Sequence, residues 1–374
     1  MTWLLLFALT ALAVVLPMLP AIAEWHRPSD VVPLYIDTQD GLDPTFLARS
    51  FVARLAAVVA VGQTQLGRSL IAQAPVRATW PLDAGERLSA VSRRVWHTAG
   101  DAELPSGVSF LAEVAAQGAL RTAVGGVYHA LWGGRYLQLA PRSSVLRWAH
   151  GTKVDVGTGC ALAGRVSADD SITVRGDTSF TLLHAPTVRF LPAQSQATAS
   201  QATAVAPSVI LLGLPTAVVW DATAGRGTCD DSLDVGAHHA WRGDLVCRAD
   251  LSLGAGCNAR GSLKSHGDIT VAAGGLIAGS VVAEGSIALG AGCAVHGSVI
   301  SETAIMLGAG CVIGAPGHPA TVAAPNIMVA PGVVVYGTLW AGTSGHTQAG
   351  AVAQAMADPD AGTLQHVLER EAAT

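Results

Sequence analysis

The chain repeats itself every 18 residues between residues 232 and 341, and this period constrains its fold more than any other feature. The copies begin at Ser232, Asp250, Asp268, Ser286, Ala304 and Asn326. A four-residue insertion around His318 precedes the last copy. A short, fixed period is typical of a solenoid, in which each coil buries its apolar face only against its neighbours.

Apolar residues alternate within each copy, at positions 2 and 4, 8 and 10, and 14 and 16. This alternation restarts every six residues, so it predicts three short strands per coil and a triangular cross-section. We therefore predict an all-β fold, a triangular β-helix solenoid with about 18 residues per coil. Glycines at positions 5 and 12 are expected to form its tight corners. The predicted core ladder is Leu233, Leu251, Ile269, Ile287, Ile305 and Ile327, with Cys257, Cys293 and Cys311 at position 8.

A second, less regular tract with the same alternation occupies residues 102–190. Residues 191–231 break the pattern. Their first part is rich in Gln, Ser, Thr and Ala and predicts a flexible excursion, whereas the apolar runs 209–214 and 217–220 predict a strand against the solenoid. One continuous solenoid interrupted by an insert is favoured over two separate domains, and a flexible tail is expected at residues 342–374.

The first 23 residues predict a membrane anchor. Residues 3–23 carry no formal charge, and as a helix they would span about 30 Å, the thickness of a bilayer core. A cleavable signal peptide ending at Ala23 is the alternative. The absence of a basic segment before the apolar run, and Arg27 after it, favour a retained anchor with the body in the cytoplasm. The anchor residues are Trp3, Leu4, Leu5, Leu6, Phe7, Leu16 and Leu19.

Residues 24–101 predict a linker followed by an N-terminal helix. Asp43 is the expected cap of this helix and Pro44 its first residue, and the helix would continue to about Val61. An open solenoid end exposes apolar side chains and unpaired strand edges. The helix is therefore expected to seal the first coil.

Charge and cysteine usage narrow the possible partners. The net charge of −5 gives no reason to expect nucleic-acid binding. No metal-binding cysteine spacing occurs, and cysteines at inward positions favour buried thiols in a reducing compartment.

Residues 303–357 contain no charged residue, so this end is expected to be covered by another copy, a partner or the tail. The alternative explanation is that the high content of Ala and Gly in this region simply leaves few positions for charged residues. The candidate self-assembly end consists of Ile327, Val329, Val335, Leu339 and Trp340.

The run from His266 through Gly279-Ser-Val-Val-Ala-Glu-Gly to Gly297-Ser-Val-Ile-Ser-Glu resembles the bactofilins, the polymer-forming cytoskeletal proteins of bacteria. The resemblance is close over residues 232–341 and loose over 102–190. It implies a right-handed triangular β-helix that assembles end to end into filaments without nucleotide. It also implies a scaffold at the inner membrane, with envelope-biosynthesis or peptidoglycan-modifying proteins as clients. The membrane span, the two tracts and the insert depart from the usual pattern of that family.

Enzymatic alternatives rest on few residues. A hexapeptide-type acyltransferase, a left-handed solenoid with a protruding histidine as general base, would use His266, His296 or His318. A polysaccharide lyase needs clustered acids and bases, yet residues 232–341 hold only ten charged residues and no cluster. We therefore expect no enzymatic activity, cofactor, metal or nucleotide. The acyltransferase is the first alternative, and an exported solenoid that binds envelope components is the second.

Overall fold

The computed structural model describes scattered residues between 2 and 18, and residues 43–73, 80–193 and 211–348. The chain divides into two compact units, Met1–Asp43 and Pro44–Thr374. In the first unit, Trp3, Leu5, Phe7 and Leu16 of the predicted anchor are helical and exposed. The other predicted anchor residues, Leu4, Leu6 and Leu19, lie outside the described residues. Among the residues that are described, no helix is both long and apolar enough to cross a membrane.

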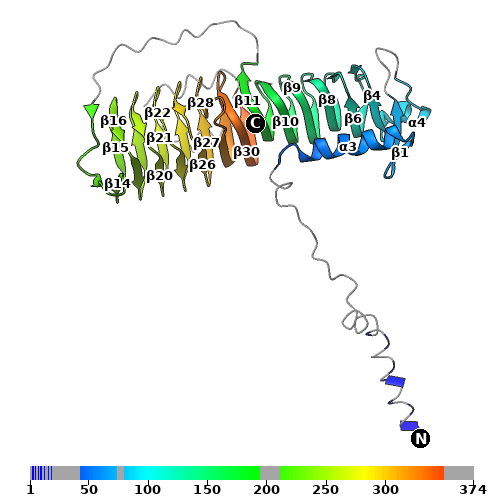
Figure 1. Ribbon diagram of the computed structural model, residues 1–374, viewed down its shortest axis with the longest axis horizontal. Coiled ribbons are helices and arrows are strands. Elements are labelled where there is room, and N and C mark those ends of the chain that lie inside the picture. Colours follow the sequence, from blue (N-terminus) through cyan, green and yellow to red (C-terminus); the bar gives the residue numbers. More distant parts are fainter. Residues whose placement is uncertain are drawn as a thin grey trace. The chain divides into compact units, whose positions relative to one another are not determined.

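The described part of the second unit is a β-solenoid whose strands join in one sheet (Figure 1). The first tract stacks parallel strands that bend around the corners of the coil. Partners in adjacent coils are 16 to 18 residues apart, as in Arg175 with Leu191 and Ser171 with Lys153. Its strands are β3 (Val91–Ser92), β4 (Val95–Thr98), β5 (Ala102–Glu103), β6 (Ser109–Ala116), β7 (Ala119–Arg121), β8 (Val127–Leu139), β9 (Ser144–Val156), β10 (Ala161–Arg175) and β11 (Ser179–Leu191).

The second tract confirms the predicted period and the three strands per coil. The predicted ladder forms, because Leu233, Leu251, Ile269 and Ile287 each pair with the residue 18 positions later, as far as Ile305. The insertion then lengthens one step, so Ile305 pairs with Ile327. The strands are β14 (Arg226–Cys229), β15 (Leu233–Val235), β16 (His239–Arg242), β17 (Asp244–Cys247), β18 (Leu251–Leu253), β19 (Asn258–Arg260), β20 (Leu263–Ser265), β21 (Ile269–Val271), β22 (Leu276–Ile277), β23 (Val281–Ala283), β24 (Ile287–Leu289), β25 (Ala294–Val295), β26 (Val299–Ser301), β27 (Ala304–Leu307), β28 (Val312–Ile313), β29 (Ala320–Val329) and β30 (Val334–Thr347).

Two kinds of corner glycine serve different purposes. At positions 5 and 12 the neighbouring coil approaches so closely that a Cβ on Gly254 or Gly261 would lie 2.4 or 2.2 Å from the backbone below. The left-handed conformation recurs at position 7, which the sequence pattern did not reveal; Gly256, for example, has φ +67°, and Gly243 and Gly337 at position 12 also have positive φ. The same corner occurs in the first tract at Gly159, with φ +72°. Glycine adopts this conformation most easily, although His238 holds position 7 of the first coil at φ 62°.

The two tracts meet tail to tail. Strands run parallel within each tract, but β11 pairs antiparallel with β30, so the last coil of one tract stacks on the last coil of the other. Figure 1 shows β11 and β30 side by side, with β14 and β4 toward opposite ends. Leu183 faces Leu339 and Val188 faces Val335 across this junction. The tracts thus share one core, as a continuous solenoid requires, but the direction of the chain reverses between them.

Three boundaries differ from the sequence prediction. The region predicted as an insert already contains β12 (Leu211–Leu212) and β13 (Val219–Asp221), which pair with β16 and β14, so the apolar runs do lie against the solenoid. β14 belongs to the first coil of the second tract, because it stacks on β17. β30 continues past the predicted end at residue 341 to Thr347, because its last residues pair with both β29 and β11. Residues 194–210 and 349–374 lie outside the described part.

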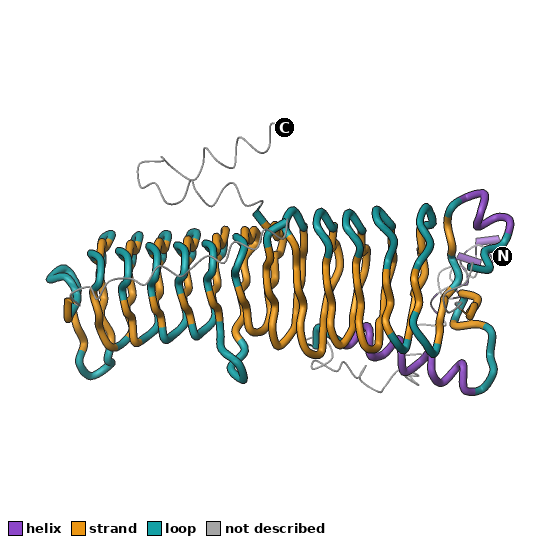
Figure 2. Tube along the Cα trace, turned by 90° about the horizontal axis from the view of Figure 1, so that it is seen from above, coloured by secondary structure: helices purple, strands orange, loops and turns teal. Residues whose placement is uncertain are grey.

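The N-terminal helix exists but does not seal the first coil. Helix α3 (Phe46–Ala60) begins after Thr45, not after Asp43. It lies along one side of the first tract, as Figure 2 shows, and buries Phe51 and Leu55 against Trp148 and Ala130. It takes this position because that side of the tract is apolar, whereas an outward sheet face is otherwise solvated.

The end of the first tract is closed by other residues. Trp80 covers the core, packing on Trp96 at 4.9 Å and on Phe110 at 5.4 Å between ring centroids, and its Nε1 donates to the Glu103 carbonyl at 2.8 Å. Short strands β1 (Gln65–Leu66) and β2 (Ser69–Gln73) and helix α4 (Ala84–Ser89) complete this end.

Candidate functional site

The predicted self-assembly end is occupied within the chain. Ile327, Val329, Val335 and Leu339 are fully buried in the last coils, where the edge of β30 is already paired with β11. A contact between copies through this edge would have to displace β11. Trp340, the remaining member of the predicted set, points outward and is 57% exposed.

Trp340 belongs to an exposed apolar row on one outward face of the solenoid. Strand pairing aligns it with Ala323 and Ile300 of the second tract, and with Leu182 across the junction. Ile300 is 41% exposed. We call the residues Leu182, Trp340, Ala323, Ile300 and Val282 the apolar row.

The same row continues into the first tract, where it is covered. Leu182 is aligned with Arg165, then Trp148 and Ala130. There α3 lies over the face, with Phe51 5.5 Å from Trp148 between ring centroids. Arg49 of α3 also pairs with Asp169 at 3.2 Å. One face of one solenoid is therefore covered by a helix over the first tract, whereas no described residue covers it over the second.

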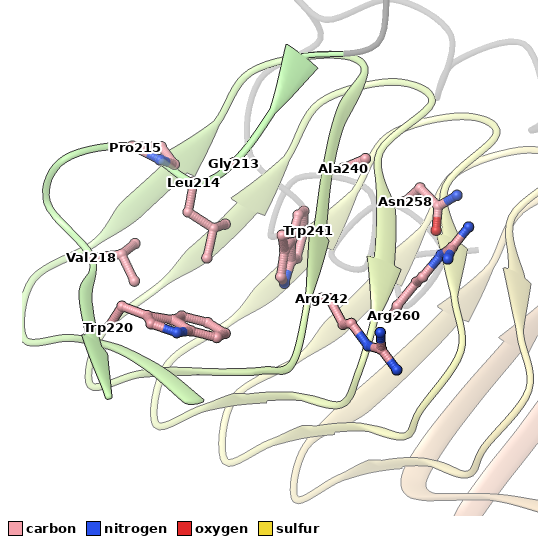
Figure 3. Close-up of a pocket in the computed structure, with 10 residues that line it drawn as sticks. All are labelled: Gly213, Leu214, Pro215, Val218, Trp220, Ala240, Trp241, Arg242, Asn258 and Arg260. Carbon is pink, nitrogen blue, oxygen red and sulfur yellow. The ribbon is translucent and has the colours of Figure 1, made fainter. Parts of the chain in front are cut away.

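A groove of about 680 Å³ lies at the outer end of the second tract (Figure 3). The chain reaches this end at β12, turns, and returns as the hairpin of β13 and β14. Apolar side chains of the turn form one wall, and strands β16 and β19 form the other. The lining residues are Gly213, Leu214, Pro215, Val218, Trp220, Ala240, Trp241, Arg242, Asn258 and Arg260.

The groove contains polar atoms without partners. Trp241 is 7% exposed, and within the described part of the chain neither its Nε1 nor the buried Oδ1 of Asn258 has a hydrogen-bond partner. Arg242 pairs with Arg260 in adjacent strands, so two cations lie side by side, and no carboxylate lies within 4 Å of either among the described residues. The repeat analysis did not single out this groove. The available signal was two arginines 18 residues apart, close in sequence to two tryptophans.

The position-8 cysteines form a structural row. Each buried thiol donates to the carbonyl at position 5 of the preceding coil: Cys257 to Gly236 at 3.1 Å, Cys293 to Ala272 at 3.2 Å and Cys311 to Gly290 at 3.1 Å. Burial raises the pKa of the Cys257 thiol. All six cysteines are free and buried. These thiols therefore satisfy corner carbonyls.

The candidate catalytic histidines are not brought together. His266 and His296 follow β20 and β25, on different sides of the coil, and His318 closes a short loop by pairing with Ala315. Nδ1 of His266 lies 2.6 Å from the Glu284 carboxylate. In the described part of the chain, no three His, Cys, Asp or Glu side chains gather closely enough to hold a metal ion.

Comparison with protein-family models, curated proteins and solved structures finds no match to this chain. The fold rests on the strand pairing described above, and the resemblance to bactofilins remains an expectation from the sequence.

Proposed function

We propose that this protein is a non-enzymatic scaffold that associates with itself at the inner membrane. The observation that supports the proposal best is the apolar row, which is bare over the second tract but covered by α3 over the first. A flat β-face with an exposed tryptophan and isoleucine and no charge between residues 303 and 357 is suited to association with another protein.

The junction between the tracts supports a lateral contact. The end of the chain's second tract is already stacked against the first, so end-to-end growth through β30 has no free edge. Lateral contact through the apolar row leaves every ladder of the solenoid intact. We propose that copies, or envelope-biosynthesis or peptidoglycan-modifying clients, bind along this row.

The N-terminal segment completes the proposal. Residues 3–23 would hold the scaffold to the inner membrane, with the solenoid in the cytoplasm, because a 21-residue uncharged run is long enough to cross a bilayer. The cysteine row is compatible with a reducing compartment, since its thiols are structural and unpaired.

Sedimentation of the body, residues 25–374, at micromolar concentration and without nucleotide tests this function. We expect assemblies of several copies, which the double variant Ile300→Glu/Trp340→Glu converts to monomers. Leu88→Glu is the matched control, because Leu88 is an exposed apolar residue on α4, outside the row. A monomeric wild-type body, or an assembly that survives both glutamates in a folded variant, would contradict the proposal.

A further inference from the structure

We infer that the groove at the outer end of the second tract binds an acidic saccharide, a hydroxylated ring that carries a carboxylate or a phosphate. The inference starts from its size and position. A groove of about 680 Å³ lies within the range of small-ligand sites. It is formed by residues of the turn between β12 and β14 that the repeat does not require.

Two unpartnered polar atoms beside the groove favour a ligand that both donates and accepts hydrogen bonds. Nε1 of Trp241 is a donor only, and Oδ1 of Asn258 is an acceptor only; both atoms are buried and have no partner among the described residues. A buried polar atom without a partner costs free energy, on the order of 1–3 kcal/mol. A saccharide hydroxyl both donates and accepts, so it matches either atom once that side chain turns toward the groove.

The two arginines, both exposed, favour an anionic ligand. Adjacent strands place Arg242 beside Arg260, about 4.8 Å apart at the backbone, and like charges at this spacing repel. A carboxylate or phosphate between the two guanidinium groups would replace the repulsion with charge-assisted hydrogen bonds. Figure 3 shows Arg242, Arg260 and Asn258 along one side of the groove.

The opposite wall of the groove is apolar and therefore favours a ligand that has an apolar face. Trp220, Leu214 and Val218 lie across the groove from the arginines, and Trp220 remains 43% exposed. The C–H face of a sugar ring packs on an indole while its hydroxyls point away. A peptide strand fits less well, because β12 and β13 have only two and three residues and offer little edge for main-chain pairing.

Saturation-transfer NMR and calorimetry of the full-length protein test this site, with glucuronic acid and glucose 6-phosphate as probes. We expect both probes to bind and neutral glucose to bind at least about tenfold more weakly. Stronger binding of one probe identifies the carboxylate or the phosphate as the preferred anion. Saturation should appear on ring protons, because the ring would contact Trp220.

Variants separate the parts of the site. Arg242→Gln/Arg260→Gln should weaken binding of both acidic probes about tenfold or more, and Trp220→Ala should weaken their binding less, by about threefold to tenfold. Arg248→Gln is the control, because Arg248 is exposed, pairs with Asp230 and lies outside the groove. Thermal melts check that each variant is folded.

Several results would overturn the inference. These are binding of inorganic phosphate as tight as that of glucose 6-phosphate, tighter binding of a triglutamate peptide, no detectable binding of either sugar acid, or binding unaffected by the arginine pair. None of these outcomes bears on self-association through the apolar row, which sedimentation measures independently.

Discussion

The two tracts reach the same fold with different cores. In the second tract, strands of two to four residues before β29 alternate with glycine corners, and the core is mostly Leu, Ile, Val, Ala and Cys. In the first tract, strands β8 to β11 have 13 to 15 residues and bend through the corners, and Trp96, Phe110, Tyr128, Phe180 and Phe190 lie in the core. In the second tract, regularly spaced corners accompany a core of aliphatic side chains. In the first tract, a core with large aromatic rings accompanies irregular spacing between the strands of adjacent coils and a helix that covers one face.

The largest expected effect is on the aromatic core. Phe110→Ala removes a fully buried ring that contacts Trp80 and stacks on Tyr128 with centroids 6.1 Å apart, so we expect a loss of about 3–5 kcal/mol in unfolding free energy. Denaturant titration measures the loss. Hydrogen exchange should show it confined to the first tract, because solenoid coils depend mainly on their neighbours. Leu111→Ala, one residue away and 36% exposed, should cost far less. Equal losses would show that the two faces of β6 do not differ in packing.

The glycine corners should show the next largest effect. A Cβ at Gly261 would lie 2.2 Å from the Gly243 carbonyl oxygen, so Gly261→Ala should cost about 1–3 kcal/mol by overpacking. The end coil has no coil beneath Gly236, where the nearest atom is a His239 ring nitrogen at 3.6 Å. Gly236→Ala should therefore be nearly neutral in the same thermal melts. If both changes cost the same, backbone conformation rather than close approach determines these glycines.

A pH dependence should distinguish the outer ends of the tracts. Burial opposes ionisation of Glu86, but hydrogen bonds from Arg94, Ser92 and the Asp83 backbone outweigh it and lower the pKa below the ordinary value of 4.5. A carboxyl with a lowered pKa stabilises the fold above its unfolded value, and this stability is lost as pH falls through the folded pKa. The first-tract end should therefore open on acidification below about pH 4.5.

Glu86→Gln tests the pH dependence. The variant should lose about 1–3 kcal/mol at pH 7, because Arg94 is left without its partner. Its stability should also vary less with acid than that of the wild type. Glu302→Gln, in the second tract, is the control and should change neither property. If the stability of Glu86→Gln falls with pH in the same way as that of the wild type, the acid transition belongs to other carboxyl groups.

Sequence predictability also differs between the tracts. In the second tract, each position of the repeat corresponds to one row of residues paired between adjacent coils, so the row from Leu233 to Ile327 could be aligned from the sequence alone. In the first tract, bulges such as the one between Ser167 and Ser171 change the spacing, and the alternation is lost to simple inspection. The repeat period predicts which residues align in adjacent coils of one tract. It gives no information on whether the two tracts stack in the same or in opposite directions. The antiparallel junction was therefore not predictable, and neither was the groove, because one of its walls comes from the turn between β12 and β14, which lies outside the repeat.

The smallest expected effect concerns the row of thiols, because the first tract makes the same contact with a threonine as well as with a cysteine, Cys160. Thr178 of the first tract donates to the Gly157 carbonyl at 3.2 Å, as Cys257 does to the Gly236 carbonyl in the second. Cys257→Ser keeps a donor of similar size and should change stability by less than about 1 kcal/mol, whereas Cys257→Ala leaves a buried carbonyl unpaired and should cost about 1–2 kcal/mol. Denaturant titration of the two variants side by side measures the difference. A serine variant as unstable as the alanine variant would mean that the volume of sulfur, not the hydrogen bond, determines the choice of cysteine at this corner. Thr178 and Cys257 would then share a position in the coil but not a role in stability.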